Sequence, residues 1–132
     1  MSATTKLFLF LGGLNAALVV ALGAFGAHVL KTRLASDMMA VYHTANLYHA
    51  IHALGLISIA IVAAWLPGSG YLKVAGWVML AGIIIFSGSL YLLSVTGTRW
   101  LGAFAPVGGV AFILAWILFC IAVLKAPSPS AP

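Results

Sequence analysis

The sequence contains very little charge, and almost none of it is negative. Among 132 residues there is one acidic side chain, Asp37, and charged residues of both signs make up 5% of the chain. A soluble globular domain has about 25% charged residues. This composition excludes a water-soluble domain, because the chain lacks the polar groups that would cover its surface. Hydrophobic residues make up 64% of the chain, so the sequence predicts an integral membrane protein.

Cysteine pairs and basic patches are missing as well. Cys120 is the only cysteine, which excludes an internal disulfide bond. The net charge of +5 comes from basic residues that occur singly along the chain, so we predict no nucleic-acid partner. Scattered basic residues are typical of positions at the edge of a membrane. They are Lys6, Lys31, Arg33, Lys73, Arg99 and Lys125.

Long apolar runs dominate the rest of the chain. A membrane-spanning helix needs about 20 mostly apolar residues, and several stretches meet this requirement. Their ranges are 7–30, 41–66, 72–95 and 101–124. The connections are short, which makes neighbouring helices antiparallel. The sequence therefore predicts an all-α membrane protein, a four-helix antiparallel transmembrane bundle forming one domain over residues 1–126, with a flexible polar tail over residues 127–132.

The basic residues do not fix the orientation of this bundle in the membrane. Antiparallel spans place half of the six basic residues at each end, so the positive-inside rule gives no preference. We call the end that carries the first and third connections end B, and the opposite end end A.

Polar side chains gather toward end B. The segment YHTANLYHAIHAL, residues 42–54, brings three histidines, two tyrosines and an asparagine into the second span. At about 100° per residue, Tyr42, Asn46 and His49 fall on one stripe. His52 lies on the flank of that stripe, whereas His43 points elsewhere. Polar groups inside a span should face protein or water rather than lipid.

The first span carries a complementary face. Its asparagine, Asn15, shares this face with Gly12, Gly23 and Gly26, and small residues let two helices approach closely in lipid. We expect the first two spans to pack through these faces, with the Asn15 amide hydrogen-bonded to His49 or His52.

The third and fourth spans add candidates near end B. Ser87, Ser89 and Tyr91 lie in this half of the third span, and we assign the two serines to the cluster. Pro106 falls early in the fourth span, where its missing N–H and fixed φ predict a local irregularity. The candidate polar cluster is Asn15, Tyr42, Asn46, His49, His52, Ser87 and Ser89, with His28, His43 and Arg99 as accessory residues.

The interpretations of this cluster differ in what the side chains bind. We favour interhelical hydrogen bonding in a structural or auxiliary protein that is not an enzyme, because the sequence shows no nucleophile beside a base and no paired carboxylates. The alternative is a site for a small polar ligand, a lipid head group or a transported proton, since histidine titrates near neutral pH. A metal or haem site is a lesser alternative. We predict no metal and no cofactor, because the histidines lack the i, i+4 spacing of a zinc helix.

Several segments together resemble one family. They are GAFGAH, YHTANLYHAIHAL, FSGSLYLLSVTG and LGAFAPVGGVAFILAW, which resemble the signature segments of the YgdD family. This is a group of small bacterial inner-membrane proteins with a domain of unknown function and a eukaryotic relative called transmembrane protein 256. The resemblance implies a multi-pass protein of the inner membrane with four spans, and it carries no activity, substrate or catalytic residue. Apart from this resemblance, the spans carry small-residue faces that offer further packing surfaces. The expected partners of the chain are therefore the lipid bilayer and either further copies of the chain or a larger membrane complex.

Overall fold

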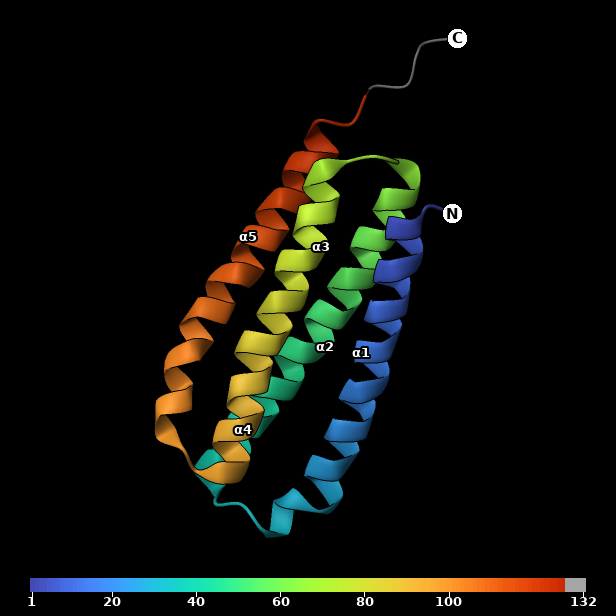
Figure 1. Ribbon diagram of the computed structural model, residues 1–132. Coiled ribbons are helices and arrows are strands. Elements are labelled where there is room, and N and C mark those ends of the chain that lie inside the picture. Colours follow the sequence, from blue (N-terminus) through green and yellow to red (C-terminus); the bar gives the residue numbers. More distant parts are fainter. Residues whose placement is uncertain (128–132) are drawn as a thin grey trace.

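The computed structural model describes residues 1–127, which form four membrane-length helical rods without any strand (Figure 1). The first rod is α1 (Ala3–His28) with the 3₁₀ turn η1 (Leu30–Thr32), and the second is α2 (Ser36–Trp65). The third rod consists of α3 (Gly70–Gly82), the π-helical turn η2 (Ile83–Ser87) and α4 (Gly88–Thr96). The fourth rod consists of the 3₁₀ segment η3 (Arg99–Phe104) followed by α5 (Ala105–Leu124). Each rod is long and apolar enough to cross a membrane, which confirms the predicted fold class. Residues 128–132, most of the predicted polar tail, lie outside the described residues.

The first two rods begin earlier than the sequence predicts. The Ser2 hydroxyl caps α1 by accepting a hydrogen bond from the backbone N–H of Thr5 at 3.1 Å. Similarly, α2 begins at Ser36, so Asp37 lies in its first helical turn and not in the connecting loop as expected. A carboxylate in a first turn is favourable because it faces the positive end of the helix dipole. Apolar runs alone cannot reveal such polar helix starts.

The longer α2 places its two buried histidines near the middle of the helix. His49 follows Ser36 by thirteen residues, or about 20 Å at 1.5 Å per residue. A start near residue 41, as the apolar run predicts, would place His49 eight residues and His52 eleven residues into the helix. Both side chains therefore need partners within the protein.

α2 is the central rod of the bundle. α1 packs along one side of α2, the α3–α4 rod packs along the other, and α5 packs against α3 and η2 (Figure 1). The largest apolar side chains that are fully buried gather where these rods meet. They are Phe8, Leu56, Ile59, Leu72 and Met79. The outer faces of α1 and α5 carry many exposed apolar side chains, as expected for surfaces in contact with lipid.

A π-helical turn interrupts the third rod, where the apolar run of the sequence predicts one continuous helix. The backbone N–H of Gly88 donates to the carbonyl oxygen of Ile83, five residues earlier. Such a turn holds about one more residue than an α-helical turn. It therefore rotates α4 by roughly 90–100° relative to an uninterrupted helix. The face that α4 presents to α2 depends on this rotation.

The π turn lies against the start of α5, where the expected irregularity is confirmed. The fourth rod begins as the 3₁₀ segment η3, and Pro106 sits in the first turn of α5. Two residues later, α5 meets the backbone of the π turn so closely that only a glycine fits. A Cβ atom on Gly108 would lie 2.5 Å from the backbone nitrogen of Phe86 and 2.7 Å from its Cα.

We predict that Gly108→Ala destabilises the bundle by about 1–3 kcal/mol, the usual cost of overpacking a tight contact. The clash is with backbone atoms, which cannot turn away as a side chain can. Gly109→Ala is the matched control, because a Cβ at that position would lie 3.9 Å from the Phe86 ring. Unfolding of both variants in mixed micelles, followed by loss of helical content, measures the difference. Equal stabilities would contradict the prediction.

Candidate functional site

His49 is the centre of a hydrogen-bonded cluster that joins three helices. Its Nε2 lies 2.9 Å from Oδ1 of Asn15 on α1, and its Nδ1 lies 3.2 Å from the hydroxyl of Tyr91 on α4. Asn46, one turn before His49 on α2, donates from Nδ2 to the Tyr91 hydroxyl and to the carbonyl oxygen of Val19, both at 3.1 Å. His49 is 4% exposed and Asn15 8%. We call Asn15, Asn46, His49 and Tyr91 the His49 cluster.

Two backbone carbonyls of α1 determine the direction of every bond in this cluster. A carbonyl oxygen only accepts, so the Asn15 atom that lies 2.8 Å from the Leu11 carbonyl is the amide nitrogen. Oδ1 of Asn15 therefore faces His49, whose Nε2 must donate to it. Nδ1 of the neutral ring is then an acceptor, and the Tyr91 hydroxyl donates to it. The Val19 carbonyl fixes the Asn46 amide in the same way, which leaves the Tyr91 oxygen as its acceptor.

Tyr42 extends the contact between α1 and α2 toward end B. Its hydroxyl donates to the carbonyl oxygen of Leu22 at 2.7 Å, and its ring meets that of Tyr91 edge-on at a centroid distance of 5.1 Å. The ring reaches α1 at Gly26, where an added Cβ would lie 2.6 Å from Cε1 of Tyr42. The predicted packing of the Asn15 face against the Tyr42, Asn46 and His49 stripe is present, including the hydrogen bond between Asn15 and a histidine.

His52 faces away from the His49 cluster, in contrast to its assignment from the sequence. Its Nδ1 donates to the backbone carbonyl of Tyr48 at 2.7 Å. Its ring stacks on Phe112 of α5, with centroids 3.4 Å apart and planes inclined by 7°. Three residues along a helix amount to a rotation of about 300°, which turns His52 roughly 60° from His49 and toward α5. Among residues 1–127, Nε2 of His52 has no hydrogen-bond partner.

The two serines do not join the His49 cluster. Ser89 donates to the carbonyl oxygen of Phe86 within its own rod at 3.0 Å. Ser87 lies in the π turn with its Oγ fully enclosed, and within the described part of the chain this oxygen has no partner. Tyr91, a candidate near end B that is not in the predicted cluster, provides the α4 contact. Helical periodicity could not select it, because the π turn precedes it.

The accessory residues lie apart from this site and are exposed. His28 ends α1, His43 lies on another face of α2, and Arg99 begins η3. The described residues contain no group of three or more histidine, cysteine, aspartate or glutamate side chains arranged to hold a metal ion.

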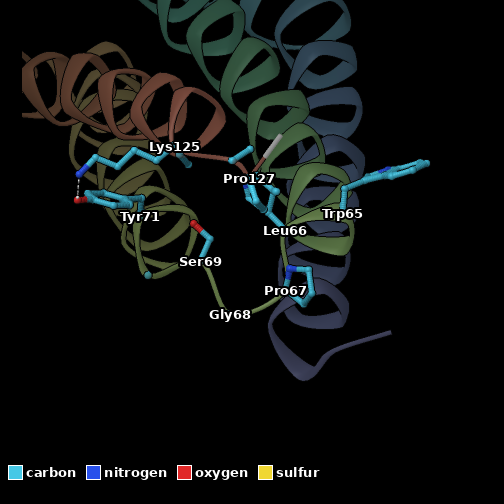
Figure 2. A pocket seen from close by; sticks show the side chains of 11 residues that line it. Trp65, Leu66, Pro67, Gly68, Ser69, Tyr71, Lys125 and Pro127 are labelled. Carbon is cyan, nitrogen blue, oxygen red and sulfur yellow. Dashed lines mark hydrogen bonds between the residues drawn. The ribbon is translucent and has the colours of Figure 1, made fainter. Parts of the chain in front are cut away.

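A further cavity lies at end A, away from the two buried histidines. It has a volume of about 540 Å³ and lies between the α2–α3 connection and the last turn of α5 (Figure 2). Lys125 donates a hydrogen bond to the Tyr71 hydroxyl, drawn as a dashed line in Figure 2. The bond is 2.7 Å long, and Nζ of Lys125 lies 4.8 Å from the centre of the Tyr71 ring. Trp65, on its rim, is 82% exposed. Aromatic and basic side chains of this kind are typical of the membrane interface.

Comparison with known proteins places the chain in a family. Residues 22–109 match a family model described as "Protein of unknown function (DUF423)". The chain belongs to the DUF423 family. The matched range holds both buried histidines and Tyr91, whereas Asn15 precedes it. The expected relationship to a family of unknown function is thus confirmed at that level.

Relatives of this DUF423 protein are named as membrane proteins. A UPF0382 membrane protein, YwdK of Bacillus subtilis, is 52% identical over 91% of this chain and 98% of its own. A UPF0382 membrane protein of Staphylococcus epidermidis is 44% identical over 91% and 97%, and one of Staphylococcus saprophyticus is 42% identical over 91% and 98%. No solved structure matches the chain. Together with the four apolar rods, these relatives confirm a multi-pass protein of a bacterial membrane.

We predict that Tyr91→Phe lowers the free energy of unfolding by about 1 kcal/mol, because it removes the donor to His49 and the acceptor for Asn46 inside the membrane. Tyr48→Phe is the matched control, since the Tyr48 hydroxyl has no partner among the described residues. The measurement is again unfolding in mixed micelles. If both variants lose the same stability, the Tyr91 hydroxyl does not contribute in the proposed way.

Proposed function

We propose that this chain is a non-enzymatic membrane protein with a structural or auxiliary role, in which the His49 cluster holds α1, α2 and α4 in register. The observation that carries this proposal is that both ring nitrogens of His49 and the hydroxyl of Tyr91 are committed to protein partners. A catalytic base or a proton carrier needs a free lone pair or an exchangeable partner. A histidine whose two nitrogens are hydrogen-bonded to side chains of other helices instead stabilises the packing of those helices.

The distribution of acidic groups supports the same proposal. Asp37, the only acidic residue, lies in the exposed first turn of α2. It is twelve residues from His49, or about 18 Å along the helix. No carboxylate side chain of this protein therefore lies beside the cluster to accept a proton from His49 or to orient its ring.

The outer surface of the bundle supports an auxiliary role. α1 and α5 are the outermost rods, and each exposes a broad apolar face with side chains such as Val20 at 72% and Ile117 at 49% exposure. Such a face contacts lipid, and it also suits packing against a helix of another copy or of a larger complex. We further infer that the YgdD proteins are members of the same family, on the four segments that resemble theirs.

The proton-transport alternative is tested with the purified protein in liposomes that hold a pH gradient. We expect the wild-type protein, His49→Gln and the exposed control His43→Gln to dissipate the gradient no faster than protein-free liposomes. A pH-sensitive dye inside the vesicles follows the gradient. Faster dissipation by the wild type that His49→Gln abolishes and His43→Gln preserves would overturn the structural interpretation of His49.

The auxiliary role predicts contacts with other protein in the native membrane. A photoreactive residue introduced at Val20 on α1, or at Ile117 on α5, samples the two outer faces separately. We expect one of the two positions to give a defined ladder of homo-oligomers or one discrete heterologous band on a gel, while the other reacts with lipid alone. Monomers from both positions in native membranes would contradict the auxiliary role.

A further inference from the structure

A groove on the outside of the bundle is lined by His52, whose Nε2 has no hydrogen-bond partner among the described residues. The groove lies between α2 and the first half of α5, and its volume of about 420 Å³ is within the usual range for small-molecule sites. Aromatic rings and His52 form most of its wall. The lining side chains used below are Tyr48, His52, Phe86, Phe112 and Trp116.

The structure fixes what His52 offers to this groove. Nδ1 faces a backbone carbonyl and therefore carries the hydrogen. Nε2 of the neutral ring is then a bare lone pair. The ring cannot turn to hide it, because the hydrogen bond to the Tyr48 carbonyl and the stacking on Phe112 hold its plane. Ser87 Oγ is the only fully enclosed side-chain polar atom without a partner in the described part of the chain, so Nε2 of His52 is reached from the groove.

The depth of this nitrogen makes an unpaired state unfavourable. His52 is 4% exposed and lies sixteen residues into a helix of 30 residues, near the middle of this membrane-length rod. No bulk water is present at that depth, and an acceptor without a donor there loses the free energy of a hydrogen bond. A ligand that brings a donor from the lipid phase would recover it.

We propose that this groove binds a lipid-soluble ring compound with a hydroxyl donor, a phenol or a hydroquinone, whose O–H donates to Nε2 of His52. A neutral donor suits the site because the lining contains no Lys, Arg, Asp or Glu side chain to balance a charged ligand. A ring suits it because Tyr48, Phe86 and Trp116 offer aromatic faces and edges, which favour offset or edge-on packing.

A metal ion fits the groove less well than such a donor. Only His52 among the lining residues carries a strong metal-binding atom, and Phe112 covers one face of its ring. A stable metal site needs several ligands. The proposal is independent of the structural role of the His49 cluster, because it uses the other histidine and the face of α2 that is turned toward α5.

Two probes that differ only in the donor test the proposal. The full-length protein is placed in lipid nanodiscs with ¹⁵N-labelled histidine and titrated with 4-hexylphenol or with its methyl ether, 4-hexylanisole. We expect a saturable shift of the His52 Nε2 resonance with the phenol, while the His49 resonances stay unchanged. The ether, which lacks the donor, should bind about tenfold more weakly or not saturate at all. Empty nanodiscs correct for partition into lipid.

Variants separate the histidine from the groove as a whole. His52→Phe keeps an aromatic ring but removes the acceptor, so the saturable binding of 4-hexylphenol should fall about tenfold. His43→Phe is the matched control on an exposed face of the same helix, and binding should be unchanged. Equal affinities for the two probes, absence of saturable phenol binding to the wild type, or unchanged binding by a folded His52→Phe would each overturn the proposal.

Discussion

The hydrogen bond between His49 and Asn15 follows from a constraint that governs the whole bundle. Inside the hydrocarbon there is no water to complete an unpaired polar group, so each such group must find its partner in the protein. The α1 carbonyls of Leu11 and Val19 orient two amides, and the amides in turn determine which His49 nitrogen carries the hydrogen. The backbone of one helix thus fixes the chemical state of a side chain on another. A helix pair joined in this way has a defined register, which apolar packing alone would specify weakly.

The two buried histidines show how a small rotation gives one residue type opposite properties. His49 and His52 are three residues apart on α2, and they face different helices. His49 donates through Nε2 to a side chain, whereas His52 donates through Nδ1 to its own backbone. The first ring is enclosed by polar partners, and the second is stacked on an aromatic ring with one nitrogen open. The sequence places both histidines in one cluster. In the structure, His49 is hydrogen-bonded through both ring nitrogens, whereas Nε2 of His52 remains available as an acceptor.

Helical periodicity predicts this protein well wherever the helices are regular. It gives the face that joins Asn15 to the Tyr42, Asn46 and His49 stripe, while the length of the apolar runs gives the spans and Pro106 indicates the irregular start of the fourth rod. It fails beyond Ile83, because a constant 100° per residue does not hold through the π turn. The serines were assigned to the cluster from their position near end B alone, and this position does not distinguish them from Tyr91. The helix starts at Ala3 and Ser36 were missed for another reason, since they depend on polar residues that an apolar run does not include.

The π turn also connects the two histidine environments. Its rotation of α4 turns Tyr91 toward His49, and its own Phe86 forms part of the groove beside His52. Gly108 of α5 touches the backbone of the same residue, Phe86. A shift of α5 against the π turn would therefore change the Tyr91 hydrogen bond and the shape of the groove together. The absence of a Cβ atom at Gly108 is thus required both for the His49 cluster and for the groove beside His52.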